Sequence, residues 1–268
     1  MARINLSKIK ADQHPECEDK DQAQLLIASL QKKLYDLLYL MFAHDRHSLL
    51  IILHGIDTAG KDGTVRHIFS GANPQGIKVF SFKKPSTEES RHDFIWRCHL
   101  HTPPSGLAAI FNRSYYEEVT TVMVHPELLK QQYLPDEIVE RPDFFQQRYE
   151  SINDFEKLLV QKGTVVVKFF LHISKKEQQQ RINERLKNRS KNWKFSEEDI
   201  KERKHWSKYM TVFEKMLTNT STSHAPWTIV PADNKWYRDY IVSKTLVEEL
   251  QKLKMQFPKA QRRTSTKA

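Results

Sequence analysis

One stretch of sequence limits the possible folds of this chain more than any other: residues 48–64, which read SLLIILHGIDTAGKDGT. The apolar run at 49–53 predicts a short buried strand. Gly55, Gly60 and Lys61 follow this run with the spacing Gly-x-x-x-x-Gly-Lys of a P-loop. The glycines allow backbone N–H groups to turn toward a phosphate, and the lysine adds a positive charge. The stretch therefore indicates a phosphate-binding strand–loop–helix unit, with an ordinary strand-to-helix turn as the alternative.

The loop departs from the standard motif in its polar residues. Position 62 is Asp, where a P-loop has the Ser or Thr that helps to hold magnesium, and Thr64 comes two residues later. Asp57 is a carboxylate inside the loop, which simple nucleotide binding does not require. We expect the metal to be held differently here. A helix is expected to follow the loop at 62–69. Besides Lys61, the predicted phosphate-binding residues of the loop are Gly55, Ala59, Gly60, Asp62, Gly63 and Thr64.

The composition indicates a soluble protein with an anionic partner. The 268 residues are 39% hydrophobic, enough for a sizeable core, and no apolar run approaches the roughly 20 residues of a membrane span. The N-terminus shows no apolar signal region, and Cys17 and Cys98 give no disulfide framework, which favours a reducing cytoplasm. The formal net charge of +10 predicts a polyanionic partner, either nucleic acid, a membrane surface, or a phosphate-rich small molecule or polymer.

Alternating apolar segments predict an α/β fold with a parallel sheet that helices cover on both faces. Helices are expected at 21–43, 141–159 and 236–255, and further strands at 77–82, 106–111, 164–173 and 226–231. Residues 1–19 are predicted to form a flexible arm, residues 20–257 one P-loop domain, and residues 258–268 a disordered basic tail.

Polar residues follow the predicted strands at their carboxyl ends, where open α/β sheets bind ligands. In P-loop enzymes a carboxylate for magnesium stands at the position of Asn112. An amide can still order a metal-bound water, and Glu117 or Glu118 could supply the missing charge. A basic track for a long anion could include Lys83, Lys84, Arg91, Arg97 and Lys168, each of which could equally be a surface charge. Arg91 and Arg97 lie on a helix that is expected to begin at 86–89.

Residues 175–209 differ from the rest of the chain in their density of positive charge. Arg181, Arg185 and Arg189 are spaced four residues apart and would form a row on one helical face. Such a row repels itself unless an anion binds to it. A mobile lid at about 180–208 that closes on phosphates is therefore the favoured interpretation, and a solvated pair of helices is the alternative.

Several ordered blocks of this sequence resemble the polyphosphate kinase 2 family. They are GIDTAGKDGT at 55–64, HDFIWR at 92–97, FNRSYYE at 111–117, YESINDFE at 149–156, KFFLHIS at 168–174, WKF at 193–195 and APW at 225–227 followed by Asp233. The resemblance implies a three-layer α/β/α P-loop kinase fold with a central parallel sheet and a helical lid, related to the nucleoside monophosphate kinases. It also implies an enzyme that moves the terminal phosphate of inorganic polyphosphate to a nucleotide, or runs the reverse reaction.

The resemblance further implies roles for single residues. Asp57 and Lys61 match the family's phosphate and metal site, and Arg113 matches a phosphate-binding arginine. Many members have Asp-Arg-Ser where this chain has Asn-Arg-Ser at 112–114. The Asn form, with Glu117 as the compensating acid, is similar to class III, whose members tend to accept both AMP and ADP and form ATP. The implied catalytic set is Asp57, Lys61, Asn112, Arg113 and Glu117, with Asp57 and Glu117 as ligands of Mg²⁺ or of Mn²⁺ in its place. Members are often homodimers or homotetramers.

Two other functions compete with this interpretation. An ATP-dependent nucleoside monophosphate kinase would share the sheet, the P-loop and the lid, and polyphosphate supplied with AMP or ADP but no ATP distinguishes the two enzymes. Nucleic-acid binding would explain the net charge and the tryptophans of the basic segment, but it leaves the P-loop unused. We expect no nucleic-acid or membrane partner. His92, His99 and His101 could suggest a metal site, but no Cys or carboxylate completes a ligand set.

Overall fold

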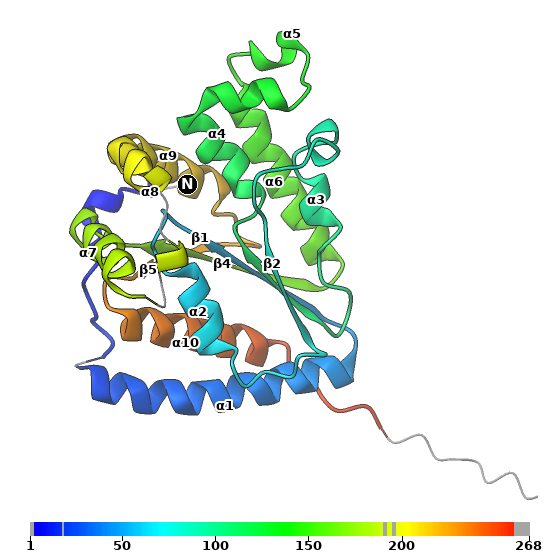
Figure 1. The fold of residues 1–268 in the computed structure, drawn as a ribbon. Coiled ribbons are helices and arrows are strands. Elements are labelled where there is room, and N and C mark those ends of the chain that lie inside the picture. Colours follow the sequence, from blue (N-terminus) through cyan, green and yellow to red (C-terminus); the bar gives the residue numbers. More distant parts are fainter. Residues whose placement is uncertain (1–2, 18, 190–191, 195–196, 260–268) are drawn as a thin grey trace, which may run out of the picture.

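The computed structural model describes residues 3–17, 19–189, 192–194 and 197–259, and in this part of the chain a parallel sheet forms the centre of the fold (Figure 1). Its strands are β1 (Ser48–His54), β2 (Ile77–Ser81), β3 (Ala108–Asn112), β4 (Thr164–His172) and β5 (Trp227–Pro231). Their order is β2-β3-β1-β4-β5, and every neighbouring pair is parallel. All residues of β1 and β3 are buried. The predicted parallel sheet is confirmed.

Helices cover both faces of the sheet, as strands with nearly continuous apolar sequence require. On one face lie α1 (Lys20–His44), α2 (Lys61–Ile68) and α10 (Lys235–Lys252), with α1 packed along α10 (Figure 1). On the other face lie α4 (Thr121–Val124), α6 (Phe144–Gln161) and α9 (Trp206–Thr220), with α6 packed against β4 and α9. The three-layer α/β/α fold expected from the sequence is confirmed.

Shorter helical segments connect these elements. They are the 3-10 helices η1 (Leu6–Lys8), η2 (Glu89–Arg91), η3 (Tyr115–Val119), η4 (Pro126–Gln131), η5 (Asn192–Lys194) and η6 (Arg203–His205), and the α-helices α3 (Trp96–His99), α5 (Asp136–Val139), α7 (Lys175–Lys187) and α8 (Glu197–Glu202). α7 and α8 lie beyond the carboxyl ends of the strands, where the lid was expected (Figure 1). Within the expected lid, residues 190–191 and 195–196 lie outside the described residues. Movement of this region as a lid stays a prediction.

The N-terminal segment is docked on the domain, so the prediction of a flexible arm is wrong for residues 3–17. Leu6 is buried, and its backbone N–H donates to the carboxylate of Glu214 at 2.8 Å. The carbonyl of Ala11 accepts a hydrogen bond from the backbone N–H of Asp233 at 3.1 Å. Ile4, Leu6 and Ile9 pack in or against the core, although their spacing of two and then three residues follows neither a helical nor a strand period. The predicted tail falls largely on residues 260–268, which lie outside the described residues.

The helix expected to begin at 86–89 and to continue to His99 does not form. Only the short segments η2 and α3 are helical there. His92 between them is extended, with φ −95° and ψ 173°. The carboxylate of Asp93 accepts hydrogen bonds from the backbone N–H groups of Ile95 and Trp96 at 2.9 and 3.0 Å. Asp93 therefore begins a new turn instead of continuing a helix, a role that short polar side chains often take.

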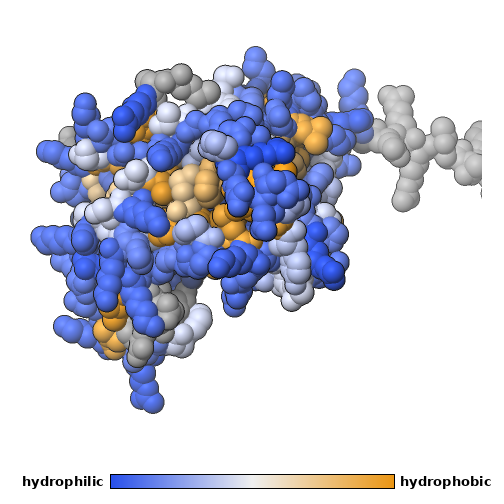
Figure 2. All heavy atoms as spheres, turned by 90° about the horizontal axis from the view of Figure 1, so that it is seen from above, coloured by the Kyte–Doolittle hydropathy of each residue, from blue (hydrophilic) through white to orange (hydrophobic). Residues whose placement is uncertain are grey.

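Seen from above, most of this face of the molecule is hydrophilic, and hydrophobic residues gather near its middle (Figure 2). Of the helices in the described ranges, none has the length and apolar character needed to cross a bilayer.

Candidate functional site

The P-loop connects β1 to α2 and requires glycine at two of its positions. Gly55 has φ 142°, and a Cβ there would lie 2.7 Å from the carbonyl oxygen of Leu171. Gly60 caps α2 with φ 107°, and a Cβ there would lie 2.2 Å from Nη1 of Arg238. Both positions combine a left-handed backbone with close packing, which only glycine tolerates. The predicted strand–loop–helix unit is present.

Lys61 crosses the inside of this loop. Its Nζ donates to the carbonyl of Gly55 at 2.7 Å and to that of Ile56 at 3.4 Å. Burial lowers the pKa of the Lys61 ammonium, and the neighbouring carboxylate of Asp57 opposes this change. The ammonium is therefore held at the amino-terminal end of α2, where the helix itself favours an anion.

Asp57 and Arg113 form an ion pair at the mouth of the loop. Nη2 of Arg113 donates to Oδ1 of Asp57 at 2.7 Å, and the two side chains are 44% and 35% exposed. Arg113 has φ 66°, an uncommon conformation for a residue with a side chain, and such strain is often found at functional sites. The pair faces solvent, so either partner can exchange the other for a phosphate or a cation.

Asn112 and Asp62 differ from the standard P-loop site in which of the two positions carries the acidic group. Nδ2 of Asn112, the last residue of β3, donates to Oδ1 of Asp62 at 2.6 Å. The standard arrangement has a hydroxyl on the loop and a carboxylate on the strand. In this chain the carboxylate is on the loop and the neutral group is on the strand, so the site keeps one negative charge at this point.

Glu117 lies on η3, near the end of β1. One of its oxygens is 3.9 Å from Nδ1 of His54, and the other accepts a hydrogen bond from the hydroxyl of Thr121. Burial raises the pKa of Glu117, but His54, Arg113 and the Thr121 hydroxyl lower it by more, so the pKa lies below its usual value. Burial lowers the pKa of His54 to about 4. Glu117 is thus an ionised carboxylate beside a neutral imidazole.

The predicted row of three guanidiniums does not form on one helix, because α7 ends at Lys187 and Arg189 lies beyond it. Arg181 is buried and turns toward the P-loop, where it donates to the carbonyls of Thr58 and Ala59 at 3.1 and 2.8 Å. It also donates to the carbonyl of Ala232 at 2.5 Å. Further along the chain Arg185 is half-buried and Arg189 is exposed. Arg181 therefore holds the loop, whereas the sequence predicted that it faces an anion.

Thr64, Gly63 and Ala59 belong to the framework of the loop. Both the hydroxyl and the backbone N–H of Thr64 donate to the carbonyl of Gly60, at 3.1 and 2.9 Å. Thr64 is fully buried, so the structure does not bring its hydroxyl to the ion pair. Gly63 faces Arg238, since a Cβ there would lie 3.6 Å from its guanidinium. Ala59 is buried and its carbonyl binds Arg181.

Arg238 is a further residue beside the P-loop that was not expected from the sequence. This residue of α10 is 1% exposed, and its Nε donates to Oδ1 of Asp239 at 2.8 Å. Its guanidinium packs behind Gly60, so a second buried cation lies beside the P-loop. A signal was present in the sequence, because Arg238 lies three and four positions before Ile241 and Val242, on the apolar face of its helix.

The residues of the predicted basic track differ in their exposure. Lys83, Lys84 and Arg91 are exposed, whereas Arg97 is buried and its Nη1 donates to the carbonyl of Lys83 at 2.7 Å. The assignment of Lys168 to this track is wrong. Lys168 is fully buried in β4 and paired with Glu156, because a lysine in an apolar strand must find its partners inside. Of the histidines, His92 stacks on Trp96 and His101 on Phe80.

A cavity of about 210 Å³ lies between the segment after β2 and α6. Its walls include Glu118, which follows Glu117 in the chain, and Pro85, which follows the exposed Lys84. The guanidinium of Arg148 lies over the rings of Phe94 and Phe144, 4.8 and 4.6 Å from their centroids. This combination of aromatic and polar walls suits a flat, partly polar group.

Three comparisons with known proteins find similar chains over most of the length. The family model described as Polyphosphate kinase 2 matches residues 17–258. An ADP-polyphosphate phosphotransferase of Rhodopseudomonas palustris is 44% identical over 256 residues, which cover 96% of this chain and 89% of the relative. An AMP/ADP-polyphosphate phosphotransferase of Meiothermus ruber is 41% identical over 257 residues, 96% of this chain and 92% of the relative. The crystal structure of polyphosphate kinase 2 from Arthrobacter aurescens superposes with a TM-score of 0.89 at 36% identity, covering 96% of this chain and 88% of that one.

Proposed function

The chain belongs to the polyphosphate kinase 2 family, and we propose that its site moves the terminal phosphate of inorganic polyphosphate to both AMP and ADP, reversibly. The observation that carries the proposal is the set of groups at the mouth of the P-loop. Lys61, Asp57 and Arg113 converge there with the amino-terminal end of α2. Relatives named for ADP and for AMP/ADP support the choice of acceptors.

Phosphoryl transfer requires alignment and positive charge around the moving group more than covalent chemistry. In the proposed mechanism the loop N–H groups and Lys61 hold the donor polyphosphate, and Arg113 leaves Asp57 to bind the transferring phosphate. Lys61, which the loop already holds in place, stabilises the developing charge without rearrangement. The acceptor is a phosphate that is ionised at neutral pH, so Asp57 positions it and is not required as a strong base.

The residues at the site fit a magnesium ion, or Mn²⁺ in its place. Mg²⁺ prefers oxygen ligands and is usually held by one or two carboxylates together with substrate phosphates. Among the described residues no three acidic, His or Cys side chains lie close enough together to hold a metal by themselves, so one or two of the carboxylates of Asp57, Asp62 and Glu117 would share the ion with substrate phosphates. The pKa of Glu117 is lowered, which favours its ionised form. When bound, the ion neutralises phosphate charge. Asn112 orients the carboxylate of Asp62 toward the strand end.

The cavity near Phe94 is our candidate for the nucleoside part of the acceptor. It continues from Glu118 next to the site, and its aromatic and guanidinium walls provide stacking surfaces for a base. Phe94→Ala should then raise KM for ADP several-fold and leave KM for polyphosphate unchanged. An equal rise in both KM values would place the base elsewhere.

We also propose that the enzyme acts in the cytoplasm as a homodimer or homotetramer. Its partners would be polyphosphate and adenine nucleotides. Light scattering of the purified protein would give the oligomeric state, and a monomeric mass for an active sample would contradict this part of the proposal.

The exchanged carboxylate and amide provide the test of the metal site. Asp62→Ser should raise the magnesium concentration for half-maximal rate by about tenfold or more, because one carboxylate is lost. Adding Asn112→Asp to this variant restores the standard arrangement of hydroxyl and carboxylate, and magnesium dependence should return toward wild type. An unchanged magnesium titration in Asp62→Ser would mean that this pair does not face the metal.

A further inference from the structure

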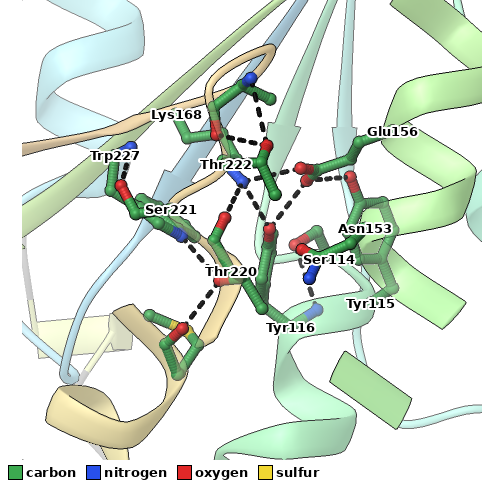
Figure 3. Close-up of polar contacts among 12 residues, drawn as sticks. Ser114, Tyr115, Tyr116, Asn153, Glu156, Lys168, Thr220, Ser221, Thr222 and Trp227 are labelled. Atoms are coloured by element: carbon green, nitrogen blue, oxygen red, sulfur yellow. Dashed lines mark hydrogen bonds and ion pairs between the residues drawn. The ribbon is translucent and has the colours of Figure 1, made fainter. Parts of the chain in front are cut away.

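A cluster of buried polar residues joins η3, α6, β4 and the end of α9 (Figure 3). At its centre is Lys168 of β4, whose Nζ donates to Oε2 of Glu156 at 2.6 Å. The same ammonium donates to the hydroxyl of Tyr116 at 2.8 Å and to the carbonyl of Thr220 at 2.8 Å. All three N–H groups of the lysine therefore have an acceptor, each from a different element of the fold.

Glu156 of α6 completes the cluster. Its Oε1 accepts hydrogen bonds from the hydroxyls of Tyr115 and Tyr116 at 2.8 and 2.7 Å. Glu156 and Lys168 are both fully buried, and burial with the carboxylate nearby raises the pKa of both tyrosines well above the usual value. The tyrosines thus remain neutral donors, and the geometry of the cluster is fixed by hydrogen bonds throughout.

Stability alone is a weak reason for such a cluster. Replacing a buried ion pair by apolar residues of similar volume is often neutral or stabilising, because desolvation offsets the attraction of the charges. A well-satisfied buried network does, however, fix one arrangement of the groups that it joins. The groups that this network fixes are therefore the elements that its residues belong to.

The two tyrosines of the network belong to the segment that carries two residues of the proposed site. Tyr115 and Tyr116 lie between Arg113 and Glu117, so the segment turns its two tyrosines inward and its two charged residues toward the P-loop. Arg113 also has a strained backbone, with φ 66°, which the surrounding structure must hold in place.

We propose that Lys168 and Glu156 are positioning residues for phosphoryl transfer, acting through Tyr115 and Tyr116 to hold Arg113 and Glu117 in their working geometry. The proposal rests on the roles proposed above for Arg113 and Glu117. Neither member of the pair reaches the solvent or the P-loop mouth. Through the carbonyl of Thr220 the pair also joins this segment to the end of α9, the helix that follows the expected lid.

The test removes one hydroxyl at a time. Tyr116→Phe keeps the ring and deletes a donor to Glu156, and a loosened Arg113 should lower kcat about tenfold with KM for polyphosphate and ADP within about twofold. Tyr149→Phe is the matched control. Tyr149 lies on the same helix as Glu156, and its buried hydroxyl has no hydrogen-bond partner among the described residues, so kcat should stay at the wild-type value.

A second set of variants keeps the proposal falsifiable if one protein is unstable. Glu156→Gln should show the same selective loss of kcat, and the loss in Tyr116→Phe combined with Arg113→Ala should be smaller than the product of the single losses. The proposal would be overturned if folded Tyr116→Phe had a lower Tm but the kcat of wild type. It would also be overturned if the loss of kcat in the double variant equalled the product of the two single losses. Wild-type activity of Arg113→Ala would instead refute the proposed function, so the two failures are distinguishable.

Discussion

Replacing Arg181 by Met tests whether this arginine supports the P-loop or binds an anion. The change keeps most of the aliphatic stem and removes a guanidinium that donates to the carbonyls of Thr58, Ala59 and Ala232. Charge-assisted hydrogen bonds are worth about 1.5–3 kcal/mol each, and the loop will relax in part, so we expect the free energy of unfolding to fall by about 3–5 kcal/mol.

Urea unfolding of wild type, Arg181→Met and Lys187→Met measures this change. Lys187 is an exposed cation on the same helix, and its replacement should alter the free energy of unfolding by less than about 0.5 kcal/mol. The loosened loop should also raise KM for polyphosphate. If Arg181→Met raises this KM while its stability stays within about 1 kcal/mol of wild type, Arg181 is an anion contact and our reasoning is wrong.

Three further predictions concern the site itself. Lys61→Met should lower kcat at least 10²-fold, because a fixed group that stabilises the developing charge is lost. Circular dichroism should show that the variant is folded. Near-normal turnover of the folded variant would mean that Lys61 is not part of the site. Asn112→Asp places a second carboxylate beside Asp62, because Nδ2 of Asn112 lies 2.6 Å from Oδ1 of Asp62. The two negative charges repel each other, so the Tm should fall without magnesium and recover when magnesium is added. A Tm that magnesium does not restore would mean that the pair lies outside the metal site. Burial lowers the pKa of His54 from 6.5 to about 4, so the unfolded chain binds more protons between these values and stability should fall as the pH drops. The loss from this residue between pH 7 and 5 is about 2 kcal/mol, and metal-free His54→Gln should lack it; identical pH profiles would contradict this assignment.

Most of the fold could be predicted because it depends on continuous apolar runs. The strands β1 and β4 carry such runs, and their flanking helices show a clear apolar period. One error arose where a local hydrogen bond decides the structure, and the other where contacts between distant residues decide it. Asp93 starts a turn inside an apparent helix, and Leu6 anchors a segment whose sequence looks like a loose arm.

The candidate site was predicted where one residue acts in a known motif, and missed where two distant residues act together. Lys61 follows from the spacing of the P-loop, and Arg113 from the resemblance to the family. The contact of Asn112 with Asp62 joins positions 50 residues apart, and the spacing of a single motif contains no information about it. Burial decided the remaining cases, since Lys168 and Arg181 carry the charge expected of anion contacts but use it on internal partners.

The most direct test of the central claim is product analysis with long-chain polyphosphate, magnesium and either AMP or ADP, in the absence of ATP. Wild type should form ADP from AMP and ATP from ADP, and Lys61→Met should form neither at a comparable rate. Transfer only when ATP and AMP are supplied together, with no product from polyphosphate, would contradict the account and would indicate a conventional nucleotide kinase.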